Sequence, residues 1–243
     1  MANEKDGVQL WENGPFWATC NIGAERPQDS GRYFWWGDTS GCVWEKGMLL
    51  GGDWIDAKGK KHIFDSGHTP TREARVPCPI LGRVLNNILQ FWAFQHVWLE
   101  NYNLTKKYDA AARLTGGSWQ MPTAQHFLDL ISKCDWTWNE LEGVAGYKIV
   151  GRGAFSNASI FLPAAGWGDE KKLVDVGVDG RYWSSSDTEY LDNRNSFIAS
   201  LGLGRNPLKI DCSLALLFER NADHQVKFLG RECGCSIRAV RVG

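Results

Sequence analysis

The last quarter of the chain places the strongest constraint on what it can fold into. Two short segments, residues 180–186 and 234–241, enclose a stretch whose side chains are mostly polar. Both segments are typical of short buried strands. A stiff pair of strands that holds a varied polar segment is what a recognition surface needs. It is not the pattern of a metal centre or a catalytic triad.

The composition favours one domain over residues 1–243. Hydrophobic residues make up 43% of the chain, which is enough for a sizeable core. The 13 Trp and 27 Gly, with few long apolar runs, indicate a loop-rich domain held together by buried aromatic side chains. The formal net charge is -1 and no basic run is present. That balance argues against nucleic acid as a partner, because phosphate neutralisation needs clustered Lys and Arg.

Two absences bear on localisation. No apolar run approaches the ~20 residues that a membrane span needs, so we expect no membrane insertion. The residues before Gly7 are polar and do not form a signal peptide. We therefore expect the chain in the cytoplasm before assembly or in a phage virion, and at the cell surface if an export signal was trimmed.

Local patterns predict an α+β chain of short strands, two or three helices and much irregular structure. A turn at 26–31 joins short strands within 10–34, and the aromatic run 33–37 is expected to form a buried strand. Further strands are predicted at 134–138, 147–150 and 159–162, with a polar loop leading from 163–167 to Tyr182. Helices are predicted at 109–114 and after Thr123, a plausible N-cap, with a buried face formed by Phe127, Leu128, Leu130 and Ile131.

A helical period also runs from Ile80 to Leu99, after an irregular stretch that holds at most a hairpin around 54–64. One interpretation is a core helix of the same domain. The other is a docking or oligomerisation helix that attaches the domain to a tail fibre or to a second copy of the chain.

Several motifs together carry a family resemblance. They are FWATCNIGA at 16–24, GRYFWWGDT at 31–39, DAA at 109–111, GGSWQMPT at 116–123, WTW at 136–138, GYKI at 146–149, IFLPAAG at 160–166, YWSSS at 182–186 and GCSIRAVR at 234–241. The chain resembles the Fibrobacter succinogenes major paralogous domain family, which abounds in gut Bacteroidetes. The range 43–108 is longer than the usual family connection, so the helix at 80–99 lies in a probable insertion.

The resemblance implies a C-type-lectin-like fold of short twisted antiparallel strands, shared with the formylglycine-generating enzyme. The variable proteins of diversity-generating retroelements use the same fold, and their variable region lies near the C-terminus. The range 182–241 has the corresponding place here. We therefore expect a non-enzymatic, retroelement-diversified or phage receptor-binding protein whose ligand is a bacterial surface protein or glycan. The expected ligand-binding residues are Tyr190, Asn193, Arg194, Asn195, Phe197, Arg205, Asn206, Asp211, Arg220, Asn221, Asp223 and His224.

Other chemistries are less well supported, and no metal or cofactor is expected. The paired triplets that ligate calcium in C-type lectins are absent, so binding is expected to be calcium-independent. Cys233 and Cys235 are interpreted as small buried strand residues, and the alternative is an oxidase that resembles the formylglycine-generating enzyme. The serines at 184–186 are expected to bond backbone groups. Arg238 and Arg241 are expected to anchor the last strand to a loop. A third alternative is an exported surface domain of unknown ligand.

Overall fold

The computed structural model describes residues 7–45, 48–50, 53–55, 61–63, 73–75, 96–169, 172–188 and 212–243. Its largest sheet has six strands in the order β17-β16-β15-β9-β8-β7. These strands are β7 (Glu73–Arg75), β8 (His96–Glu100), β9 (Asn103–Leu104), β15 (Asp179–Asp187), β16 (Cys212–Glu219) and β17 (Gln225–Gly230). Only β7 and β8 pair in parallel among them.

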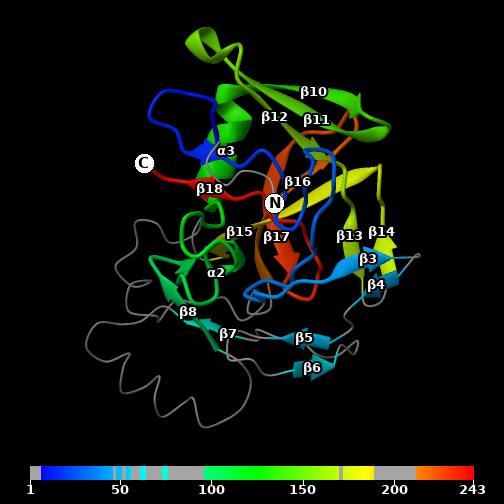
Figure 1. Ribbon diagram of the computed structural model, residues 1–243. Helices are drawn as coiled ribbons and strands as arrows, with labels where there is room; N and C mark the ends of the chain where they lie inside the picture. Colours follow the sequence, from blue (N-terminus) through cyan, green and yellow to red (C-terminus); the bar gives the residue numbers. More distant parts are fainter. Residues whose placement is uncertain are drawn as a thin grey trace.

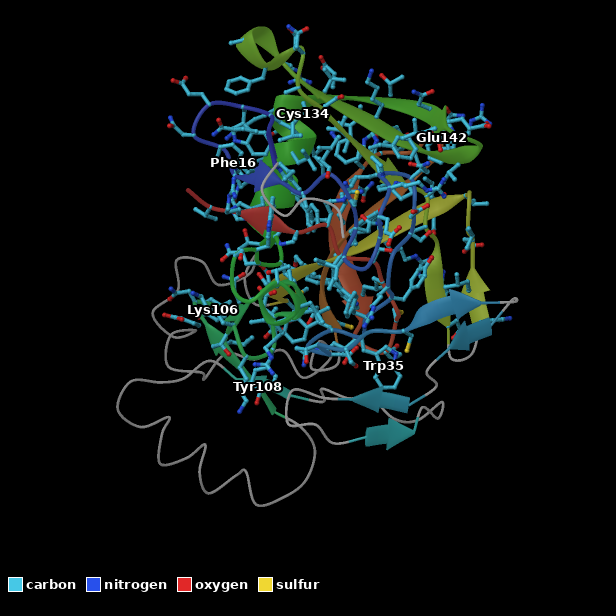
Figure 2. The ribbon with its side chains drawn as sticks, in the orientation of Figure 1. Phe16, Trp35, Lys106, Tyr108, Cys134 and Glu142 are labelled. Carbon is cyan, nitrogen blue, oxygen red and sulfur yellow. The ribbon has the colours of Figure 1, made fainter. Side chains whose placement is uncertain are left out.

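A second, three-stranded sheet is a meander of β10 (Cys134–Leu141), β11 (Val144–Gly151) and β12 (Ser159–Pro163). Glu142 and Gly143 form the two-residue turn between β10 and β11, and both have positive φ angles, 49° and 81°. Two such residues make the type of turn whose twist matches paired strands. In Figure 1 this sheet lies at the top of the molecule, and Glu142 lies at the outer tip of its hairpin in Figure 2.

The remaining sheets are small. β1 (Val8–Gln9), β2 (Phe16–Trp17) and β18 (Val240–Arg241) form one sheet, so the two ends of the described chain lie side by side. Three two-stranded hairpins are β3 (Val43–Glu45) with β4 (Met48–Leu50), β5 (Asp53–Ile55) with β6 (Lys61–Ile63), and β13 (Trp167–Asp169) with β14 (Lys172–Val174).

Both helices predicted at 109–114 and after Thr123 are present, and Thr123 is the predicted N-cap. Asp109 caps α2 (Ala110–Leu114), and its carboxylate accepts a hydrogen bond from the Ala112 amide. Thr123 caps α3 (Ala124–Lys133), where its hydroxyl accepts from the His126 amide and the His126 ring accepts from the Thr123 amide. The two reciprocal bonds satisfy backbone donors that a helix start would leave without partners. A short 3-10 turn, η1 (Gly153–Phe155), follows β11.

The two long central strands divide the core. Tyr182 and Trp183 are neighbours on β15 and point to opposite faces of the sheet, as side chains of a strand do. Tyr182 packs with the residues of β10–β12 and α3, and Trp183 packs with the residues before β3 and after β17. β15 and β16 are therefore covered on both faces.

Arg238 is the buried anchor that the sequence predicts. Its guanidinium is 0% exposed and donates to the carbonyls of Ala18, Thr19 and Phe161 and to Oδ1 of Asn21. Arg241 instead lies over the rings of Phe16 and Trp119, 5.2 and 5.3 Å from their centroids.

The expected α+β class is wrong for the described residues, which are mostly β with two α-helices. Three local expectations also change. The run 33–37 is buried but makes only isolated bridges, Tyr33 with Cys42 and Phe34 with Cys235. The polar loop before Tyr182 contains the hairpin β13–β14. The helix predicted from Ile80 to Leu99 cannot extend to its end, because residues 96–99 belong to β8.

The common cause of these differences is that strand pairing here joins residues far apart in the sequence, which a local period does not detect. The hairpin expected around 54–64 is confirmed by β5 and β6. The rest of the proposed docking helix, residues 80–95, lies outside the described residues. The end of the supposed insertion, β8 and β9, joins the central sheet through the pairing of Asn103 with Ser186.

Candidate functional site

The first group of predicted ligand-binding residues lies between β15 and β16. Its members are outside the described residues: Tyr190, Asn193, Arg194, Asn195, Phe197, Arg205, Asn206 and Asp211. The structure shows the two points from which this part of the chain departs. Asp187 ends β15, Cys212 begins β16, and Asp187 is paired directly with Ser213 across the ladder. The segment 189–211 therefore starts and finishes on adjacent core strands.

One buried side chain connects these two points. The Arg231 guanidinium donates from Nη2 to Oδ1 of Asp187 at 2.7 Å, and from Nε to Oγ of Ser213 at 2.8 Å and to the carbonyl of Cys212 at 3.1 Å. The side chains of Arg231 and Asp187 are 0% and 1% exposed. The guanidinium also lies over the Trp36 ring, 4.5 Å from its centroid. We call Asp187, Ser213, Arg231 and Trp36 the clamp.

The strand that leads to the clamp is irregular in a defined way. Trp183 pairs with Ala215 and Asp187 with Ser213, so four steps along β15 correspond to two along β16. The extra residues are satisfied elsewhere: the Ser184 hydroxyl donates to the Leu214 carbonyl at 2.6 Å, and Ser186 bonds Asn103. A bulge of this kind bends a strand and redirects its end.

The serines at 184–186 are structural, as predicted. The Ser185 amide donates to the Pro122 carbonyl at 2.8 Å. The Ser186 hydroxyl accepts from the amide of Ala124 at 2.9 Å and donates to Oδ1 of Asn103 at 2.6 Å. These bonds attach the start of α3 and the β8–β9 hairpin to the end of β15.

The second group of described candidates lies on the turn between β16 and β17. Arg220, Asn221 and Asp223 are exposed, and Asn221 has a φ angle of 60°, in the left-handed region that Asn tolerates. His224 is half-buried instead. The exposed side chains of Arg220, Asn221 and Asp223 can thus contact a ligand, whereas the His224 ring packs against the protein.

His224 packs on two aromatic rings of the β10–β11 sheet. Its ring centroid lies 4.2 Å from that of Trp136 and 4.4 Å from that of Tyr147. Its Nε2 is buried and has no hydrogen-bond partner. Burial lowers the pKa of His224, against a smaller opposing effect of the Asp223 carboxylate. The contacts indicate that His224 fixes the turn and is not one of its recognition side chains.

The two groups of candidates are attached at opposite ends of one strand. β16 has eight residues between Cys212 and Glu219, which span ~23 Å at ~3.3 Å per residue. Leu214, Ala215 and Leu216 in its middle are 0% exposed. The polar stretch of the sequence is therefore interrupted by a core strand, and the turn 220–224 does not adjoin the ends of segment 189–211.

Cys233 and Cys235 have the buried, structural setting that the sequence favours. Both are free thiols in buried positions. Burial raises the pKa of Cys233 to about 12 and raises that of Cys235 well above its ordinary value, with a smaller effect of the neighbouring thiol. Thiols that remain protonated are poor nucleophiles and poor metal ligands.

Neither a metal-binding cluster nor a membrane-spanning helix is found within the described ranges. The described residues contain no group of three or more His, Cys, Asp and Glu side chains placed to hold a metal ion. Among the same residues, no helix has the length and apolar character that a membrane crossing requires.

The clamp was not among the sequence predictions. In the sequence, Asp187 is the acidic residue that follows the motif at 182–186, and none of the motifs includes Arg231. The available signal was an acidic residue directly after the buried strand motif at 182–186, since a carboxylate at that position needs a partner. Nothing local identifies Arg231 as that partner, 44 residues away.

Comparisons with known proteins leave the family open. No protein-family model, no curated protein and no solved structure matches the chain. The resemblance to the Fibrobacter succinogenes major paralogous domain family therefore stays a prediction from the motifs.

Proposed function

We propose that this protein is a non-enzymatic binding protein that presents segment 189–211 on a β frame. The observation that carries the proposal is the clamp: Arg231 forms a buried ion pair with Asp187 at the end of β15 and hydrogen bonds to Cys212 and Ser213 at the start of β16, the two strands from which the segment departs. The clamp fixes the two strand ends from which the segment departs. We expect the side chains of the segment to contact the ligand.

The chemistry of the segment suits recognition. Tyr and Arg are enriched among the residues that dominate binding energy, and Asn adds adaptable hydrogen bonding. The family resemblance extends the proposal to the ligand, a protein or glycan of a bacterial surface, and to diversification of the segment by a retroelement or its use in a phage receptor-binding protein.

The catalytic alternative has less support. An oxidase that used Cys233 and Cys235 would need at least one thiolate, and the raised pKa values of both thiols oppose its formation. The proposal therefore assigns these two residues to the core.

The test measures binding of the fluorescently labelled chain to fixed cells of a gut Bacteroidetes species. A loop variant carries alanine at five positions, Tyr190, Asn193, Arg194, Asn195 and Phe197. We expect saturable binding by the wild type and at least a roughly tenfold weaker Kd for the loop variant, since several contact residues are lost together. Cells treated with periodate or with protease distinguish a glycan ligand from a protein.

Two matched variants locate the binding surface. A turn variant carries Arg220→Ala, Asn221→Ala and Asp223→Ala, and a control carries Glu140→Ala and Lys148→Ala, which are exposed on the β10–β11 sheet. We expect near wild-type binding from the control and a smaller loss from the turn variant than from the loop variant. Equal binding by wild type and loop variant would contradict the proposal.

A further inference from the structure

Arg231 touches the chain at the last residue of β15 and at the first two residues of β16. Three of its acceptors, Asp187 Oδ1, Ser213 Oγ and the Cys212 carbonyl, belong to the two strand ends that flank segment 189–211. Arg presents several donors in a planar fork of fixed geometry, so bonds in different directions also fix the relative position of the acceptors. A lysine at the same position has a single ammonium and lacks this fork.

The position of Arg231 is itself determined by the core. Its carbonyl accepts from the Trp36 amide at 3.3 Å, and its guanidinium lies over the Trp36 ring. The indole Nε1 of Trp36 donates to the Ser184 carbonyl at 2.8 Å. The Trp36 ring therefore packs against the face of the Arg231 guanidinium, and its indole N–H bonds to β15.

The end of β15 has a second tie besides the ion pair. The Asp187 amide donates to the Tyr102 carbonyl at 2.8 Å, and Oδ1 of Asp187 also accepts from the Thr188 amide at 2.8 Å. The carboxylate therefore orients the first peptide beyond the strand as well as meeting Arg231. A change at Arg231 is transmitted to that peptide through Oδ1.

We propose that Arg231 is a positioning residue, which sets the relative place of the two strand ends, Asp187 and Cys212, from which segment 189–211 departs. Its role is not restricted to adding stability. This inference rests on the proposed function only for its consequence in binding, because the positions of the strand ends are measurable without any ligand.

The test separates position from stability with a charge-neutral pair. Arg231→Met and Asp187→Leu are expected to destabilise the fold when made singly, because each leaves a buried charge without its partner. The double variant removes both charges, and such replacements of buried ion pairs are commonly tolerated or stabilising. We expect the double variant to recover most of the wild-type melting temperature while lacking the bonds from the Arg231 guanidinium to the two strand ends, with only the backbone pairing of Asp187 and Ser213 kept.

Hydrogen exchange measured by mass spectrometry on the whole chain gives the decisive readout. In the double variant, peptides that contain Cys212 and Ser213, whose backbone groups the two substitutions leave in place, are expected to exchange roughly tenfold faster than in the wild type, the effect of about one lost hydrogen bond. Peptides from α3 and β10–β12 are expected to keep wild-type rates. Wild-type exchange at Cys212 and Ser213 in the double variant would overturn the inference.

Arg231→Lys keeps the inference testable if the double variant does not fold. Lysine can meet the Asp187 carboxylate but cannot also bond Ser213 and Cys212 in the geometry of the fork. We expect faster exchange at Cys212 and Ser213 and nearly normal exchange at Asp187. Unchanged exchange at all of these residues would count against a positioning role.

Cell binding by the same variants separates this inference from the proposed function. Faster exchange at the strand ends together with weaker binding supports both. Faster exchange with unaltered binding supports the positioning role of Arg231 and counts against segment 189–211 as the binding surface.

Discussion

Arg238 offers the sharpest test of how the core is held, because its charge is buried among neutral acceptors. Its four hydrogen bonds, to Asn21, Ala18, Thr19 and Phe161, are 2.6–3.0 Å long. Burial lowers its pKa, but an arginine stays charged in a protein near neutral pH. In Arg238→Met, the acceptors would remain buried without this donor.

The expected size of the effect follows from these bonds. Hydrogen bonds from a charged group contribute about 1.5 kcal/mol each at the lower end of the measured range, so four give ~6 kcal/mol. Methionine also removes the desolvation cost of the buried charge, which we take to offset about half of that sum. We therefore expect Arg238→Met to lower the free energy of unfolding by ~3 kcal/mol, a large but survivable loss for a folded domain.

Arg152 provides a matched control. It makes three hydrogen bonds, to Asp135, Ser132 and Cys134, at 2.7–2.9 Å, but its side chain is 54% exposed. Water can replace the lost donor there, so Arg152→Met is expected to cost less than ~1 kcal/mol. Urea unfolding followed by tryptophan fluorescence measures both variants. Losses that agree within ~0.5 kcal/mol would refute the reasoning, because burial would then not determine the cost.

Three other predictions concern single features of the fold. Thr123→Ala removes the α3 cap and is expected to lower the free energy of unfolding by ~1 kcal/mol in the same urea assay; a value near zero would show that the capping box with His126 contributes little. Because burial lowers the pKa of His224 below its ordinary 6.5, the folded state favours the neutral ring, so its contribution to stability is complete above pH 6.5 and is lost as the pH falls below that value. His224→Phe is expected to remove this part of the pH dependence in melting experiments, and an unchanged pH profile would contradict the assignment. Cys233 and Cys235 are expected to resist iodoacetamide at pH 8 in the folded chain and to react fully in denaturant, as read by mass spectrometry; rapid labelling of the folded chain would show a reactive thiol.

Expectations from local sequence signals were the most successful. The helix at 109–114, the cap at Thr123 and the strands at 134–138, 147–150 and 159–162 are confirmed. A cap bonds an amide within three residues, and β10, β11 and β12 follow each other closely in the chain. The information for these elements therefore lies in neighbouring residues.

Expectations that depended on distant partners were the ones that changed. The run 33–37 is as apolar as a central strand. Its backbone nevertheless bonds to three separate residues, Cys42, Cys235 and Arg231, and not to one continuous partner strand. The helical period that ended at Leu99 did not reveal that residues 96–100 pair with β7 and β9. A short apolar run fits a strand, a helix end or an irregular core segment, and its neighbours in space decide among them.

The candidate site shows the same division. The sequence by itself determined that buried strand segments flank a polar stretch and that Arg238 had to be anchored. Both follow from the order of residues, because a charged residue within a buried strand needs a partner. Only the tertiary structure decided that β16 divides that stretch. It also decided that Arg231 joins the end of β15 to the start of β16. The reason is that Arg231 lies 18 residues from Ser213 and 44 from Asp187, and such bonds exist only after the strands have paired.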